Sequence, residues 1–173
     1  INRAVKAAIW ADQEAGKKVS LITVGAKAKG FFGREEFIIG SHPAPTTETI
    51  VELSKAIAAE ATAQFLGTAE GVDEDSRPNR VVLFYNRFVS VLTQEVTPIQ
   101  LLPLEPAIEE GGGEAFQREP VFEPSRGEIL EHLVPVTLES MLQQAMFNSA
   151  AAEIAARRVM NEKGVVGVLI RCG

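Results

Sequence analysis

Apolar residues follow two kinds of pattern along this chain, short continuous runs and longer stretches at helical spacing. Continuous β-branched runs are typical of strands buried on both faces of a sheet, and they fall at 19–24, 80–84 and 165–170, with a shorter candidate at 37–39. Helical spacing indicates helices over 2–15, from 47 to about 66 and from 125 to about 160. Helices that alternate with buried strands predict an α/β fold.

The predicted architecture is a single α/β domain over residues 1–173, three-layered and Rossmann-like. A mostly parallel sheet carries helices on both faces, and one long helix occupies the C-terminal half. Ser125 and Glu128 have the spacing of a capping box at the start of this helix. Pro135 interrupts its pattern, and a helix of about 35 residues is roughly 50 Å long.

A polar triplet, Tyr85-Asn86-Arg87, separates two strand-like halves between residues 80 and 96. A strand ordinarily ends in turn residues, whereas a second β-branched, partly alternating run follows this triplet. We interpret Asn86 and Arg87 as a network that holds a strand crossing, with direct contact to a partner as the alternative.

The last 13 residues, 161–173, break the long helix and then resume a strand pattern. A parallel sheet without its central strand has two unpaired edges and an open core, and residues 165–170 can fill that slot. We therefore expect this segment to pair between other parallel strands. A free tail, or an antiparallel strand at the edge of the sheet, would contradict the hypothesis.

Composition narrows the class of protein. The chain has 46% hydrophobic and 23% charged residues with a net charge of −6, as expected for a soluble globular protein. The negative balance argues against a general binder of nucleic acid or anionic membranes. No apolar segment reaches membrane-spanning length, and the first residues do not form a secretory or transit peptide. The single cysteine, Cys172, has no partner for an intrachain disulfide.

The sequence predicts no catalytic, cofactor or metal site. The segment from Gly25 to Gly30 follows a strand but lacks the spacing of a phosphate loop, so we interpret it as a strand-to-helix turn. Three nearby basic residues could form a small basic rim: Lys27, Lys29 and Arg34. His42 and His132 have no cysteine or carboxylate at ligand spacing and are interpreted as surface or boundary residues.

The other reactive side chains also have structural interpretations. Cys172 lacks a nearby histidine and is interpreted as a small strand-end residue rather than a nucleophile. Three glutamates are interpreted as a helix cap and a solvated face: Glu123, Glu128 and Glu131. Arg157 and Arg158 lie late in the long helix, where positive charge interacts favourably with the helix dipole, and a partner contact there is the alternative.

Five short blocks of sequence follow one another between residues 1 and 160, each separated from the next by other residues. They are Val24-Gly25 with Lys27, Gly30 and Phe31-Phe32; Tyr85 to Ser90; Pro98 to Leu104; Val121 to Pro135; and Ser149 to Arg157. In this order they resemble the gamma subunit of F-type ATP synthases, the central-stalk rotor subunit. Ile154 departs from the family pattern, which usually has histidine at that point.

The tail resembles the family's first strand, moved to the carboxyl end. Cys172-Gly173 followed by Ile1-Asn2 would resemble the family's junction between first strand and first helix. On this view residues 1–160 match the central domain and the start of its last helix, and 161–173 are a turn plus the displaced strand. We therefore expect a circularly rewired domain, or segments joined out of order, with both shaft arms absent. Such a polypeptide alone would not couple rotation to synthesis.

The resemblance implies a non-catalytic rotor component, without cofactor or metal, that links the c ring to the catalytic alpha/beta hexamer of a proton-translocating ATP synthase. Its implied partners are the alpha and beta subunits, an epsilon-type (mitochondrial delta-type) subunit and the c ring, and no nucleic acid. It would lie peripherally at the bacterial plasma membrane or mitochondrial inner membrane, rather than the thylakoid, because no two-cysteine insert is present. Candidate structural or partner-contact residues are Tyr85, Asn86, Arg87, Glu123, Ser125, Arg157 and Arg158.

Two other functional classes stay open. One is a freestanding Rossmann-like domain that binds a small ligand at the carboxyl ends of its strands. The other is an adaptor that uses its long helix as a docking surface. A nucleotide titration separates the first from the others, and co-purification with c-ring or epsilon-type subunits favours the rotor.

Overall fold

A computed structural model describes residues 1–33, 35–70, 72, 77–104, 126–159 and 166–172. The elements follow in the order α1 (Asn2–Glu14), β1 (Val19–Val24), α2 (Ala26–Phe32), β2 (Ile38–His42), α3 (Ile50–Leu66), β3 (Pro78–Phe88), β4 (Gln94–Leu102), α4 (Arg126–Val159) and β5 (Val166–Cys172). The three predicted helices and the buried strand at 19–24 are confirmed. The turn predicted after Gly25 also leads directly into a helix, α2.

One mixed sheet has the strand order β2-β1-β5-β3-β4. Within the described residues, β1 and β2 are the only parallel neighbours, while β1 with β5, β5 with β3, and β3 with β4 are antiparallel. The α/β class is as predicted, but the expectation of a mostly parallel sheet is wrong. A short connection between two consecutive strands, as between β3 and β4, allows only antiparallel pairing.

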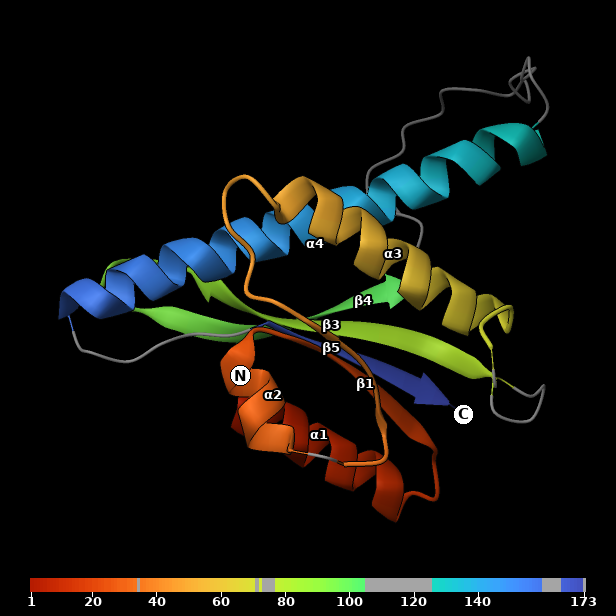
Figure 1. Cartoon of the computed structure of the whole chain (residues 1–173), viewed down its shortest axis with the longest axis horizontal. Helices are drawn as coiled ribbons and strands as arrows, with labels where there is room; N and C mark the ends of the chain where they lie inside the picture. The colour runs from red at the N-terminus through yellow and green to blue at the C-terminus, as the bar shows by residue number, and fades with distance from the viewer. Residues whose placement is uncertain (34, 71, 73–76, 105–125, 160–165, 173) are drawn as a thin grey trace, which may run out of the picture.

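The position predicted for the tail strand is confirmed and its direction is wrong. β5 lies inside the sheet, with Val168 opposite both Ile22 of β1 and Leu83 of β3, but it runs antiparallel to both. Helix α4 ends near the end of the sheet where β3 also ends (Figure 1). Only six residues then precede β5, and six residues span at most about 20 Å, so the strand starts at that end.

The two ends of the chain lie at opposite ends of the sheet (Figure 1). Val166, at the start of β5, pairs with Val24, whereas Cys172 pairs with Pro78 at the other end of the sheet. Asn2 lies near the Val24 end, because its side chain donates a hydrogen bond to the carbonyl oxygen of Lys27. The structure therefore does not bring Cys172 next to Asn2, and the resemblance of the two ends to the family's junction stays a prediction from the sequence.

Helices cover both faces of the sheet, with α1 and α2 on one face and α3 and α4 on the other (Figure 1). Alternate residues of the strands supply the two cores, as the two-residue period of a strand requires. Ile22 and Leu83 belong to the core beneath α3 and α4, whereas their neighbours Leu21 and Phe84 belong to the core beneath α1 and α2. The central part of the sheet in β1 and β3 is therefore buried on both faces, in agreement with the continuous apolar runs of these strands, whereas the edge strands β2 and β4 are partly exposed.

The stretch from residue 80 to 96 folds differently from the prediction. The polar triplet does not separate two strands, because β3 continues through it to Phe88. The chain reverses at residues 89–93, where the backbone N–H groups of Val89 and Ser90 both donate to the carbonyl oxygen of Thr93. The β-branched residues after the triplet therefore form a turn, and β4 starts only at Gln94.

The long helix of the C-terminal half is confirmed as α4, with 34 residues and Pro135 inside it. At the usual helical rise this length is about 50 Å, much longer than the strands that it crosses. Its apolar stripe packs on the sheet and on α3 through buried residues that include Leu138, Leu142 and Met146. The capping residue predicted at Ser125 lies outside the described residues.

Candidate functional site

The predicted polar triplet lies where β3 passes beneath α4. Tyr85 is buried in the core formed with α3 and α4, Asn86 is half-buried, and Arg87 is exposed. The backbone N–H of Asn86 donates a hydrogen bond of 3.2 Å to the hydroxyl oxygen of Ser149 on α4. We call this contact the β3–α4 joint. It brings together two of the sequence blocks identified above, which are 63 residues apart.

The joint supports the part of β3 that extends beyond its central neighbour. Pairing between β3 and β5 ends at Phe84, two residues before Asn86. Ser149 is only 5% exposed, and Ala145, Met146 and Ala152 are buried around it on the same side of α4. Because small side chains let a helix approach a strand closely, the hydroxyl reaches the strand backbone directly. Because the bond uses the backbone of Asn86 and not its side chain, the interpretation of Asn86 and Arg87 as a polar network stays a prediction.

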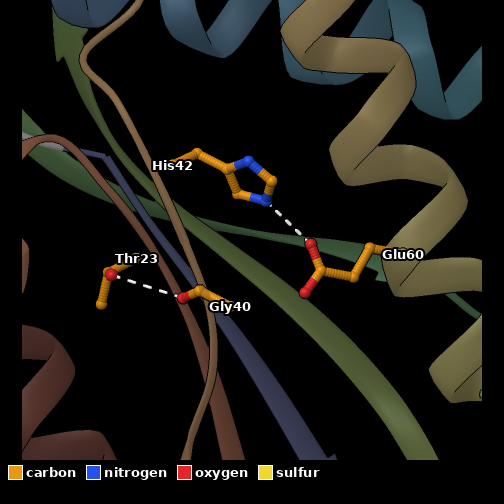
Figure 2. A network of polar contacts seen from close by, with 4 residues as sticks. All are labelled: Thr23, Gly40, His42 and Glu60. Carbon is orange, nitrogen blue, oxygen red and sulfur yellow. Dashed lines mark hydrogen bonds and ion pairs between the residues drawn. The ribbon is translucent and has the colours of Figure 1, made fainter. Parts of the chain in front are cut away.

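A second polar contact holds the edge strand β2 to α3. His42, the last residue of β2, lies 2.8 Å from Glu60 of α3, measured between Nε2 and Oε2, and both side chains are about one quarter exposed (Figure 2). Gly40 leaves room for the Glu60 carboxylate, because a Cβ at this position would overlap it. Local sequence does not indicate this partner of His42, since Glu60 lies 18 residues away on another element.

The remaining predicted site residues lie elsewhere. Arg157 and Arg158 fall in the last turn of α4, and their side chains are outside the described part of the structure, as are Glu123 and Ser125 entirely. His132 is exposed on α4. Among the described residues no three histidine, cysteine or acidic side chains could hold a metal ion.

Exposed apolar side chains gather on two features near these contacts. One is the β3–β4 turn, where Val91 is 49% and Leu92 is 82% exposed. The other is the outward side of α4, where Val136, Phe147 and Ile154 are each at least half exposed. Apolar patches on a helix that is firmly held on its inner side are typical of surfaces covered by another protein. None of the helices described is sufficiently long and apolar to cross a membrane.

These features describe an α/β domain in which polar contacts link two helices to the sheet and a long helix keeps apolar side chains exposed. Comparisons with known proteins agree with this class. The model of a family described as ATP synthase matches residues 1–162, so β5 lies outside the match. The chain belongs to the ATP synthase gamma family.

Individual relatives give the same assignment. The ATP synthase gamma chain of Pseudarthrobacter chlorophenolicus is 37% identical over 157 residues, which is 86% of this chain and 50% of that protein. That of Stenotrophomonas maltophilia is 31% identical over 159 residues, 89% of this chain and 50% of that protein. The chain therefore spans about half the length of the curated relatives it matches.

A solved structure supports the fold. A chain in the structure of the Tetrahymena thermophila mitochondrial ATP synthase, central stalk and c ring, superimposes with a TM-score of 0.55. The superposition covers 78% of this chain and 55% of that one at 20% sequence identity, so the likeness concerns the fold alone.

Proposed function

We propose that this domain is a non-catalytic component of the rotor of a proton-translocating F-type ATP synthase, where it links the c ring to the alpha/beta hexamer. The observation that carries the proposal is the family match over residues 1–162. The architecture is suited to a mechanical role, because a stiff helix transmits force only when it is fixed to a rigid body. The β3–α4 joint and the core beneath α4 provide such a fixation.

The proposal extends to partners, location and domain organisation. Its partners would be the alpha and beta subunits, an epsilon-type subunit and the c ring, at the bacterial plasma membrane or mitochondrial inner membrane. Residues 1–173 would act as one domain with Rossmann-like layering, because helices cover both faces of a single sheet. The candidate structural or partner-contact residues would remain Tyr85, Asn86, Arg87, Glu123, Ser125, Arg157 and Arg158.

Co-purification tests the assignment. The tagged chain is mixed with a purified epsilon-type subunit and with detergent-solubilised c ring of a bacterial ATP synthase, and the eluted complex is analysed. We expect a stable complex with at least one of them and no affinity for ATP in a calorimetric titration. ATP binding without either complex would instead indicate a freestanding ligand-binding domain and would reject the rotor assignment.

One substitution separates support from partner contact within the triplet. Arg87→Glu changes an exposed side chain without touching the buried joint. Loss of the complex with unchanged thermal stability would place Arg87 at a partner interface, and retention would leave only the supporting role for this segment. Lys55→Glu, a charge reversal on an exposed residue of α3, is the matched control.

A further inference from the structure

Charge is distributed very unevenly along the chain. Residues 1–34 contain seven basic and two acidic residues, a formal charge of +5, so the remaining 139 residues carry −11 of the total of −6. The basic segment forms α1, β1 and α2, and the two helices lie together on one face of the sheet (Figure 1). The negative overall charge therefore conceals a basic surface on the layer opposite α3 and α4.

A wide surface cleft of about 1060 Å³ opens on this basic layer. Its lining comes from α1, the turn into β1, the end of α2 and the segment before β2. The charged residues that line the cleft are three lysines, Lys6, Lys17 and Lys18, and two glutamates, Glu35 and Glu36. Lys17 also contacts Asp12 at 3.9 Å, so its charge is partly compensated within the chain.

Two aromatic side chains stand exposed in this cleft. Trp10 is 57% and Phe31 is 45% exposed, and the Lys6 ammonium lies 4.7 Å from the centre of the Trp10 ring and 5.9 Å from that of Phe31. Such a cation–π arrangement holds both rings and the charge in one place. Large rings that are fixed beside a cation and left uncovered are typical of the anchor positions of protein interfaces.

We propose that this cleft is a docking site for a protein segment that carries both acidic and apolar side chains. The apolar side chains would cover Trp10 and Phe31, and the carboxylates would pair with Lys6 and its basic neighbours. The concave shape favours a peptide segment over a lipid bilayer, which presents a broad surface. A peptide can place its carboxylates beside Lys6 and away from Glu35 and Glu36, whereas a nucleic acid carries a phosphate at every nucleotide and would meet both carboxylates.

The protein contains its own probe for this site, since Trp10 is its only tryptophan. The full chain is titrated with a capped synthetic peptide that alternates glutamate with leucine and phenylalanine, and Trp10 fluorescence is recorded. We expect a saturable blue shift that weakens as salt is added, because ion pairs at a surface are screened. A peptide with lysine in place of every glutamate should cause no shift.

Matched variants locate the binding. Lys6→Glu retains the tryptophan, and we expect it to weaken peptide binding about five- to tenfold, since one lost charged contact is worth roughly this factor. Phe31→Ala should weaken it similarly. Lys27→Glu makes the same charge change on the exposed part of the same layer but outside the cleft, and should change affinity less than about twofold.

Titrations with other ligands test whether the cleft binds a membrane or a nucleic acid instead of a peptide. The same titration is run with vesicles of phosphatidylcholine, with and without phosphatidylserine, and with a single-stranded oligonucleotide. A shift with anionic vesicles or with the oligonucleotide, and none with the acidic peptide, would overturn the proposal. Equal effects of Lys6→Glu and Lys27→Glu on peptide binding would overturn it too, because attraction would then be diffuse rather than local.

Discussion

The layer of α3 and α4 and the layer of α1 and α2 cover opposite faces of the same sheet, yet they bury very different amounts of it. Among the described residues, sixteen buried side chains form the core beneath α3 and α4, and seven form the core beneath α1 and α2. The thinner layer carries the basic charge and the exposed Trp10 and Phe31. We therefore propose that the layer of α3 and α4 contributes more to the stability of the fold, and that the layer of α1 and α2 provides the binding surface described above.

Truncations in the two cores test this comparison most strongly. Leu142 is 0% and Ile9 is 1% exposed, so each truncation to alanine leaves a cavity. We expect Leu142→Ala to lower the free energy of unfolding by about 4 kcal/mol, and Ile9→Ala by about 2–3 kcal/mol because fewer neighbours surround it. Urea denaturation measures both values.

Leu133→Ala is the control for these truncations, because Leu133 is 53% exposed on α4 and its loss should cost less than about 0.5 kcal/mol. If Ile9→Ala lowers the free energy of unfolding as much as Leu142→Ala, the two layers contribute equally to stability, which would contradict the difference proposed here.

The β3–α4 joint should have the next largest effect. Ser149→Ala removes the acceptor of the Asn86 N–H and leaves this donor without its partner at a partly buried position. We expect a loss of about 1–2 kcal/mol in urea denaturation. Ser140→Ala is the matched control, since the exposed Ser140 hydroxyl bonds only to the Val136 carbonyl of its own helix. Equal effects of the two substitutions would show that the β3–α4 joint does not contribute to stability.

The attachment of the edge strand β2 should contribute less. Gly40→Ala displaces the Glu60 carboxylate from its place beside His42, at an expected cost of about 1 kcal/mol. In a Glu60→Ala background the same substitution should be nearly neutral, because nothing remains to be displaced. A double-mutant cycle on thermal or urea unfolding measures this coupling, and additive effects would show that Gly40 and Glu60 act independently.

The smallest effect on stability is expected for Lys6→Glu. Lys6 lies on the exposed side of α1, and lysine and glutamate have similar helix propensities, so the free energy of unfolding should change by less than about 0.5 kcal/mol. The same variant is expected to weaken peptide binding. A large loss of stability would instead show that Lys6 stabilises the fold, which would contradict the proposal that the layer of α1 and α2 serves mainly for binding.

The sequence predicted the elements well where pattern and burial agree. The continuous apolar run of β1 and the long stripe of α4 each have a single physical solution, a doubly covered strand and a helix packed on one side. The strand predicted across Val89 and Val91 is wrong, although β-branched residues favour strands. Hydrogen bonds to Thr93 place them in a turn instead.

Two other features could not follow from local pattern. The direction of β5 depends on where α4 ends relative to the sheet, which is a tertiary property. Likewise, the contact between His42 and Glu60 requires β2 and α3 to be placed in space first. The role of the polar triplet stays a prediction, because the bond to Ser149 uses the backbone N–H of Asn86 and not its side chain.

The position of β5 has a consequence for how the chain assembles. β1 with β2 and β3 with β4 form two separate half-sheets, and among the described strands only β5, which follows the other four in sequence, bonds to both. As the polypeptide leaves the ribosome, each half-sheet has an open edge that faces the missing centre. Completion of the domain must therefore wait for residues 166–172, and until then these edges are targets for chaperones or for pairing with the wrong chain.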